Sequence, residues 1–166
     1  MATSYPPVGF HFKISFANQQ LSDGNISFIH AQEVKGLSAT IETGDTIKEG
    51  GENTFVHKLP GRVTYSTITI VRGMVSGSAF VEWAKKAVER YQFEPVDLLI
   101  TLLDEQHQPL EYWYVVNAYP AKISTSDFNA QDNKLVIETL ELNYQFFQRG
   151  DASEKRTINT GFNSLI

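Results

Sequence analysis

The side chains that most often carry chemistry in proteins are few in this chain and lie far apart. The histidines stand at His11, His30, His57 and His107. None of them lies within four residues of another, so the sequence predicts no local metal site. His11 falls on the polar face of a predicted strand and His107 in a predicted turn, which makes both of them surface residues. We therefore expect no resident metal and no cofactor.

Carboxylates are the next candidates, because a pair of them can serve as general acid and general base. Asp104 and Glu105 are adjacent in a predicted turn, where neighbouring side chains point apart. Glu138 and Glu141 fall on opposite faces of a predicted strand. The chain also lacks the G-x-S-x-G, P-loop and G-x-G-x-x-G patterns. We therefore expect a protein that is not an enzyme.

A group of aromatic residues is the remaining chemical signal. Tyr112, Trp113, Tyr114 and Tyr119 lie in one predicted strand. Such groups bind sugars in some proteins, and more often they fill a barrel core or a subunit interface. From the residues alone, a monomeric β-barrel binding module that uses these aromatics is the functional class that stays open.

The composition excludes several other classes. The chain has 166 residues and no cysteine, which suits one domain without disulfides or thiolate zinc sites. Its formal net charge is -5, and an acidic surface repels the phosphates of nucleic acids. No apolar run reaches the ~20 residues of a membrane-spanning helix, so we expect no membrane anchor.

Most of the chain alternates apolar and polar residues with the period of two that is typical of strands. Val63 to Arg72 carries apolar groups on both faces, which predicts a strand covered on both sides. Leu59 to Arg62 contains Pro60 and Gly61 and predicts a turn. The predicted strands and apolar stretches are 10–16, 26–34, 37–42, 55–59, 63–72, 96–103, 110–119 and 135–147.

One amphipathic helix precedes Pro95, which prevents its continuation. Ser76 or Ser78 is expected to cap its first turn. Its polar face carries Glu82 and Lys86 at the favourable i,i+4 spacing. We expect its apolar face to cover the domain's own sheet, and this face consists of Phe80, Trp83, Ala84, Ala87, Val88 and Tyr91.

The residues alone therefore predict a mainly antiparallel β domain with one helix. The domain is expected to occupy residues 1–147. Residues 148–166 are polar with few apolar anchors, which predicts an extended C-terminal extension. Long strands leave edges that must close into a barrel or find partners.

Several segments resemble, in order, the phage tail tube proteins, a family also found in extracellular contractile injection systems. The resemblance covers about residues 5 to 147, and its order and spacing carry more weight than any single piece. The matching segments are 5–8 with 10–12, 33–37, 49–53, 58–62, 68–73, 102–105, 113–120, 128–130 and 137–142. The last of the long matches, Trp113-Tyr114-Val115-Val116-Asn117-Ala118-Tyr119-Pro120, is similar to the family's W-x-x-x-N-A-[WFY]-P strand.

The resemblance implies the tail-tube fold, which is shared with the hemolysin-coregulated protein of type VI secretion. In that fold an antiparallel two-sheet β-barrel or sandwich carries one flanking helix and a long loop between rings. The resemblance further implies homo-hexameric rings that stack into the inner tube of a contractile particle. The implied partners are sheath, baseplate and terminator or cap proteins, with payload or DNA passing through the lumen.

The resemblance also assigns the contact between rings to the loop 43–62, because the matching loop of tube proteins reaches toward the adjacent ring. The loop is too long and too charged for a simple turn, as functional loops often are. The residues expected to make the contact are Ile47, Glu49, Gly50, Gly51, Asn53, Phe55, His57, Lys58, Leu59, Pro60 and Arg62.

Two alternatives remain open beside the main tube subunit. One is a tube-initiator ring on the baseplate, and the other is the monomeric binding module. The sequence leaves the kind of particle open as well: a virion, an extracellular particle or a cell-anchored system. In each case we expect assembly in the cytoplasm of the producing cell.

Overall fold

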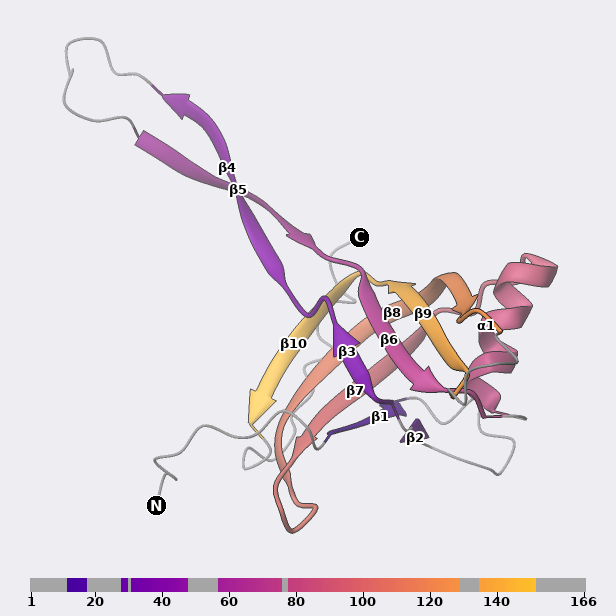
Figure 1. Ribbon diagram of the computed structural model, residues 1–166. Helices are drawn as coiled ribbons and strands as arrows, with labels where there is room; N and C mark the ends of the chain where they lie inside the picture. The colour runs from indigo at the N-terminus through magenta and orange to yellow at the C-terminus, as the bar shows by residue number, and fades with distance from the viewer. Residues whose placement is uncertain are drawn as a thin grey trace.

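The computed structural model describes residues 12–17, 28–29, 31–47, 57–75, 78–128 and 135–151. This part of the chain is mainly antiparallel β with one helix, as the sequence predicts (Figure 1). The elements are β1 Phe12–Phe16, β2 Phe28–Ile29, β3 Glu33–Lys35, β4 Ala39–Ile47, β5 His57–Tyr65, β6 Ile68–Gly73, α1 Ala79–Arg90, β7 Val96–Leu103, β8 Pro109–Thr125, β9 Ile137–Asn143 and β10 Phe146–Asp151.

The body of the molecule is built around β8, which is 17 residues long. The strand order is β2-β1-β7-β8-β9-β6-β3, and β10 also pairs with β8. The first part of β8 lies between β7 and β10, and its last part pairs with β9. Between the two parts, Asn117 has a left-handed backbone with φ 51. Its backbone N–H donates to Asp97 Oδ1 at 2.9 Å and its side chain donates to Gln145 Oε1 at 2.8 Å, which fixes the bend.

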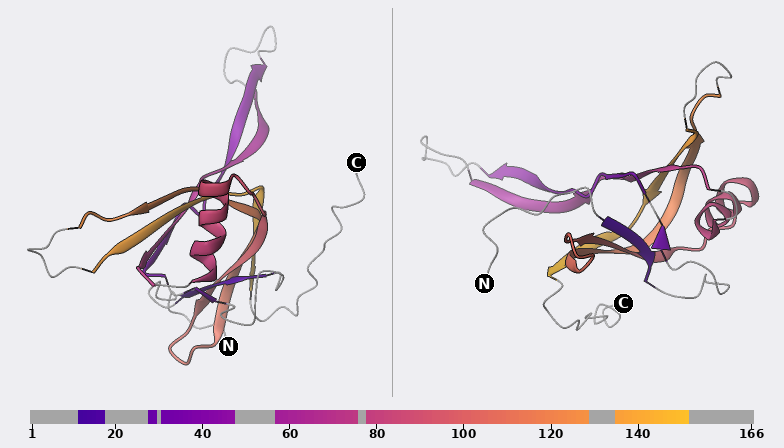
Figure 2. Two further views of the ribbon diagram at one scale, coloured as in Figure 1. Left: turned by 90° about the vertical axis from the view of Figure 1, so that its right-hand side faces the viewer. Right: turned by 60° about the horizontal axis from the view of Figure 1, so that its bottom comes forward.

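The core lies between the strands and α1, which covers one side of the body (Figure 2). Alternate residues of β6, β7 and β9 point inward, and Ile68, Leu98 and Leu142 are fully buried. The helix inserts Phe80, Trp83, Ala84 and Ala87, as its apolar stripe predicts. Trp83 Nε1 donates a hydrogen bond to the Glu94 carbonyl at 2.8 Å, so the indole is buried with its polar atom satisfied.

Some element boundaries differ from the sequence expectations for identifiable reasons. The strand expected over 135–147 divides into β9 and β10 at Tyr144 and Gln145, because the chain must follow the bend of β8. The strand expected over 63–72 divides into β5 and β6 at Ser66 and Thr67. β10 continues through Asp151 and so crosses residue 147. The division of the chain at residue 147 stays a prediction.

The described residues 43–47 and 57–62 of the loop expected at 43–62 belong to a two-stranded ribbon. β4 and β5 pair with each other and project away from the body (Figures 1 and 2). We call this ribbon the arm. The turn expected at Leu59 to Arg62 lies inside β5, where the pairing register shifts between Ile41 and Thr43. Pro60 is tolerated there because it stands on an exposed ribbon with a bulge and not in the middle of a sheet.

Candidate functional site

The structure separates the predicted ring-contact residues into three groups. Lys58, Leu59, Pro60 and Arg62 lie on β5 with exposed side chains. Ile47 and His57 form the outermost described backbone pair of the arm. Outside the described residues lie Glu49, Gly50, Gly51, Asn53 and Phe55.

The arm exposes apolar side chains to solvent. Ile41 and Val63 stand directly opposite each other on the two strands, so they share one face of the ribbon. Their exposed fractions are 63% and 46%, and that of Leu59 is 51%. An isolated two-stranded ribbon is at best marginally stable in water. Both observations are typical of an element that is completed by a partner.

The base of the arm is held to the body by close backbone packing. Gly36 leads from β3 into the arm with φ +87, a left-handed conformation that glycine adopts without strain. A Cβ atom at this position would overlap the carbonyl of Thr67 on the returning chain. The hydroxyls of Ser38 and Ser66 form a hydrogen bond of 2.7 Å across the same crossing. The two strands therefore leave the body side by side and in a fixed register.

Three aromatic rings connect the arm to the body. Tyr65, the last residue of β5, lies 5.8 Å from Tyr144 and 5.6 Å from Phe147, measured between ring centroids. Tyr144 stands at the corner between β9 and β10. Its hydroxyl is buried and has no hydrogen-bond partner among the described residues. Burial, together with the neighbouring Tyr65, raises the pKa of Tyr144 above its ordinary value.

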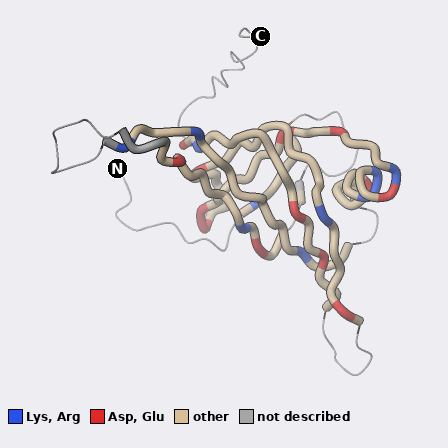
Figure 3. The backbone as a smooth tube through the Cα atoms, turned by 90° about the horizontal axis from the view of Figure 1, so that it is seen from above, with Lys and Arg blue, Asp and Glu red and all other residues tan. Residues whose placement is uncertain are grey.

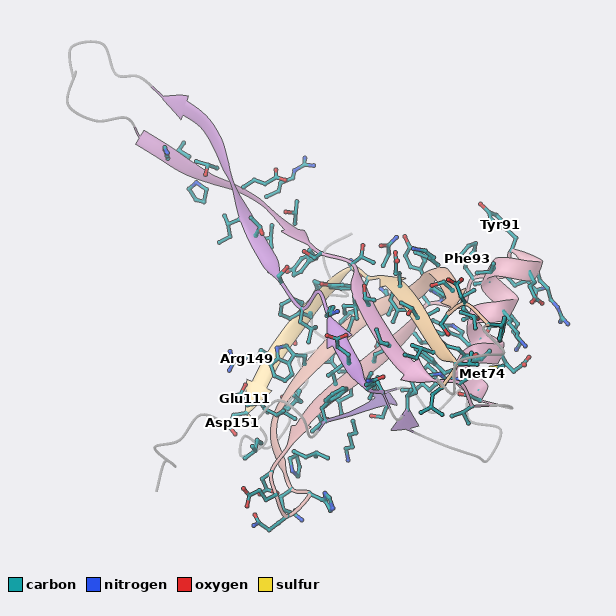
Figure 4. All side chains as sticks on the ribbon, viewed as in Figure 1. Met74, Tyr91, Phe93, Glu111, Arg149 and Asp151 are labelled. Carbon is teal, nitrogen blue, oxygen red and sulfur yellow. The ribbon has the colours of Figure 1, made fainter. Side chains whose placement is uncertain are left out.

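A second exposed apolar surface lies at the C-terminal end of α1, and we call it the aromatic patch. It consists of Tyr91, Phe93 and Tyr119, with exposed fractions of 84%, 44% and 37%. Tyr91 and Phe93 lie 5.1 Å apart and Phe93 and Tyr119 6.0 Å apart, each pair in a T-shaped arrangement. Figure 4 shows Tyr91 and Phe93 at the end of α1, on the side of the body away from the arm.

The aromatic patch corrects the predicted burial of the helical stripe. Val88 and Tyr91 are exposed, although helical spacing places them with the buried residues. The reason for Tyr91 is that α1 ends at Arg90. Tyr91 then takes a left-handed conformation with φ 55, and its backbone N–H bonds to the Lys86 carbonyl. The charged residues of α1 have both signs and face solvent (Figure 3).

The other aromatics of β8 are engaged with their own neighbours. Tyr114 donates a hydrogen bond to Asp97 Oδ2 at 2.7 Å. The guanidinium of Arg149 lies 5.6 Å from the centroid of Trp113, and its Nε donates to Glu111 at 2.6 Å. The ring of Tyr112 fills the space above Gly150, where a Cβ atom would overlap it. The contacts of Trp113 and Tyr112 hold β10 to β8, and the hydrogen bond of Tyr114 holds β8 to β7, so these aromatics are engaged within the subunit.

A buried ion pair joins the sheet to the start of α1. Arg72 on β6 is 5% exposed and Glu138 on β9 is 9% exposed. Arg72 Nε and Nη2 donate to Glu138 Oε2 at 3.0 and 2.9 Å, and Nη1 donates to Ser78 Oγ at 2.9 Å. The N-cap residue is Ser78, one of the two serines expected to cap the helix. Its side chain, however, makes no cap hydrogen bond. Its hydroxyl instead accepts from Arg72, which the sequence alone does not indicate.

Within the described ranges, no group of three or more histidine, aspartate or glutamate side chains is arranged to hold a metal ion. No helix in the same ranges is both long and apolar enough to cross a membrane.

The comparisons with known proteins point in one direction. A model of the family described as T4-like virus tail tube protein gp19 matches residues 8–148. No curated protein matches the chain. A chain in the six-fold symmetrised baseplate structure of the anti-feeding prophage is similar at 28% identity and TM-score 0.79. That likeness covers 92% of this chain and 100% of the other.

Two further structures share the fold. A chain in the extended sheath-tube complex of the extracellular contractile injection system PVC has 23% identity and TM-score 0.74. The likeness covers 89% of this chain and 93% of that one. Hcp1 from Flavobacterium johnsoniae has 16% identity and TM-score 0.56, over 86% of this chain and 96% of its own.

Proposed function

Because the chain belongs to the T4-like virus tail tube protein gp19 family, we propose that its copies form hexameric rings that stack into the inner tube of a contractile injection particle. The family is one of structural tube proteins. The tube is a passive conduit, and payload or DNA passes along its lumen. The subunit assembles in the cytoplasm of the producing cell, and its partners are further copies of itself, the sheath, the baseplate and a terminator or cap.

The observation that carries this proposal is the exposed arm on a subunit of this fold. The arm exposes Ile41, Leu59 and Val63 to solvent, and in the monomer these apolar side chains contribute no stabilisation by burial. The unpaired edges of the sheet also need partners. A head-to-tail contact that closes by rotation makes a ring, and an axial contact stacks one ring on the next. We assign the axial contact to the loop 43–62, of which residues 43–47 and 57–62 belong to the arm. In the ring, the sheet of each subunit closes as the barrel of the tail-tube type.

The test removes the end of the arm. Deletion of Ile47 to Asn53 should leave a subunit that folds with an unchanged thermal melt, because the described core contains none of these residues. Single rings should still form, and tubes should not. Negative-stain electron microscopy and sedimentation velocity distinguish monomers, rings and tubes. Normal tubes from the deletion variant would move the axial contact elsewhere, with the C-terminal residues 148–166 as the next candidate.

A second candidate function is a specialised ring at the baseplate end of the tube. The observation that favours it is the 28% identity with a chain of the anti-feeding prophage baseplate. Labelling the protein with gold-conjugated antibody in isolated particles separates the two. Label along the whole tube supports the main tube subunit, and label at the baseplate alone supports the specialised ring.

A further inference from the structure

We propose that one face of the sheet formed by β3, β6, β9 and the last part of β8 lines the lumen, and that paired charges on it let hydrophilic cargo of either sign pass without being held. This inference rests on the proposed function, because a lumen exists only in the assembled tube. We call this face the wall. Its side chains form two rows across the strands: Glu33, Val71, Thr139 and Ser124, and Lys35, Thr69, Glu141 and Lys122.

The wall points away from the core of the subunit. On β6 and β9 the residues that alternate with those of the wall are buried, among them Ile70, Leu140 and Leu142. Successive side chains of a strand point to opposite faces of the sheet, so the wall residues lie on the other face. No side chain of the wall is buried by the described part of the chain.

The sheet that carries the wall has an open edge on each side. β3 pairs with β6, and residues 119–125 of β8 pair with β9, and neither pairs with a further strand among the described residues. β7 and β10 pair with the first part of β8, no further than Ala118. An edge strand presents N–H and C=O groups that can pair with another chain. The sheet can therefore continue from copy to copy around a ring.

The other elements of the body indicate which face of that ring is the inner one. Phe80 and Trp83 of α1 belong to the same core cluster as Ile70 and Leu140, so α1 lies on the core side of the sheet (Figures 1 and 2). Ile14 of β1 and Leu98 of β7 also belong to this cluster. In a closed ring the outer layer has the longer circumference. The layer that holds α1, β1 and β7 therefore lies outside, and the wall lies inside.

Every charge of the wall has a partner of opposite sign on the same face. Lys122 Nζ lies 2.8 Å from Glu141 Oε1 across β8 and β9. Lys35 Nζ lies 2.9 Å from Glu33 Oε2 along β3. The wall therefore has no net charge, whereas the chain carries -5, so the acidic excess lies outside the wall. Exposed ion pairs contribute little to stability. The main effect of these pairs is to leave the lumen without a field of one sign.

The uncharged side chains of the wall are small, and most of them are hydroxyls. They are Thr69, Val71, Ser124 and Thr139, and none of them belongs to the exposed large apolar side chains of the described structure. Tyr119, which precedes the wall on β8, packs against Phe93 of the aromatic patch. A hydrophilic cargo that meets neither an apolar area nor a field of one sign has little to bind to.

The first test locates the wall in the tube. The chain has no cysteine, so an introduced thiol reacts without background. Thr69→Cys lies on β6, away from the edges of the sheet, and Lys86→Cys on the exposed face of α1 is the matched control. We expect a maleimide coupled to an antibody to label both variants as free subunits and only Lys86→Cys in tubes. N-ethylmaleimide should still label Thr69→Cys in tubes, because a lumen admits small molecules and a closed interface does not.

The second test breaks the charge pairing. Glu141→Gln leaves Lys122 unpaired on the wall, and Glu82→Gln leaves Lys85 unpaired on α1, so both variants gain the same charge. Tubes are sedimented with a fluorescent single-stranded DNA at about 0.01 M ionic strength, where charges act over about 30 Å. We expect Glu141→Gln tubes to retain the DNA, and wild-type and Glu82→Gln tubes to retain none. A lysine-rich peptide should be retained more by Lys122→Gln tubes than by Lys85→Gln tubes.

The outcomes separate this inference from the proposed function. Tubes in which the antibody-coupled maleimide labels Thr69→Cys as well as Lys86→Cys would overturn the placement of the wall and leave the tube function intact. Wild-type tubes that retain the DNA, or equal retention by Glu141→Gln and Glu82→Gln tubes, would overturn the role of the charge pairs alone. A wild-type protein that forms neither rings nor tubes at any concentration would overturn the proposed function as well.

Discussion

The guanidinium of Arg72 connects three elements of the fold through two side chains. It bonds to Glu138 at the start of β9 and to Ser78 at the start of α1. Both charged groups are removed from water, so their stability depends on this geometry. The pair therefore determines where the helix begins relative to the sheet.

Removal of one partner should be more damaging than removal of both. We expect Arg72→Leu to lower the free energy of unfolding by about 3–5 kcal/mol, because Glu138 would remain buried without its partner. The double variant Arg72→Leu with Glu138→Leu should recover most of this loss. Urea unfolding followed by circular dichroism measures both values. If the two single losses simply add in the double variant, the ion pair is not the cause.

The buried hydroxyl of Tyr144 slightly lowers the stability of the monomer. Tyr144→Phe removes a buried oxygen without a partner among the described residues, so we expect the free energy of unfolding to rise by about 1 kcal/mol. The raised pKa of Tyr144 means that the folded state favours the protonated hydroxyl. The stability that the folded state gains from this preference is fully present below the ordinary pKa of 10.0, and it is lost as the pH rises through the raised pKa of the folded state.

The advantage of the Tyr144→Phe variant should therefore grow above pH 10, where the wild type loses stability by ionisation. Thermal melts of both proteins between neutral pH and this range provide the measurement. A constant difference across the series would show that Tyr144 ionises as easily in the folded as in the unfolded chain.

At the scale of elements, α1 is attached to the body through Trp83. The indole is 3% exposed and meets Phe16 at 6.0 Å and Phe80 at 5.5 Å between ring centroids. We expect Trp83→Ala to cost about 3–5 kcal/mol of stability, through the cavity it leaves. Val88→Ala on the same helix is the matched control and should stay within about 0.5 kcal/mol. Equal thermal melts for the two variants would contradict this placement of the helix.

The elements that the sequence predicts well are those with one buried face. β7 runs from Val96 to Leu103 as expected, because its apolar run is bounded by Pro95 before it and by the turn at Asp104 after it. β8 extends beyond the expected end at Tyr119, because Pro120 pairs with Leu142 at a register shift where no ladder N–H is needed.

The candidate site was harder to predict than the fold. The arm carries no alternation with a buried face, since both faces meet solvent, and Pro60 with Gly61 suggests a turn where β5 continues. Tyr91 continues the helical spacing of the buried stripe, but the helix has ended by then. Periodicity indicates which face an element would bury, whereas the position of its last residue depends on the tertiary structure.

At the scale of the whole molecule, the net charge of -5 opposes assembly. The net charge of each copy acts on its neighbours through space. At an ionic strength of 0.01 M this repulsion reaches about 30 Å, and at 0.15 M about 8 Å. We expect the assembled fraction, measured by sedimentation velocity, to rise across this range. An assembled fraction that falls with salt would show that attraction between charges dominates the contacts.

The bent strand β8 also has a mechanical consequence. Paired strands resist a force along their length, because all their hydrogen bonds carry the load together. A force across the strands breaks the bonds one after another and separates the strands more easily. Because β8 pairs with β7 and β10 along its first part and with β9 along its last part, tension applied on one side reaches the other through covalent backbone. The pairing of β2 with β1 spans only Ile14 with Ile29 and Ser15 with Phe28. Under load, the described part of the subunit should be stiff along β8. The short pairing of β2 with β1 should be the first to separate.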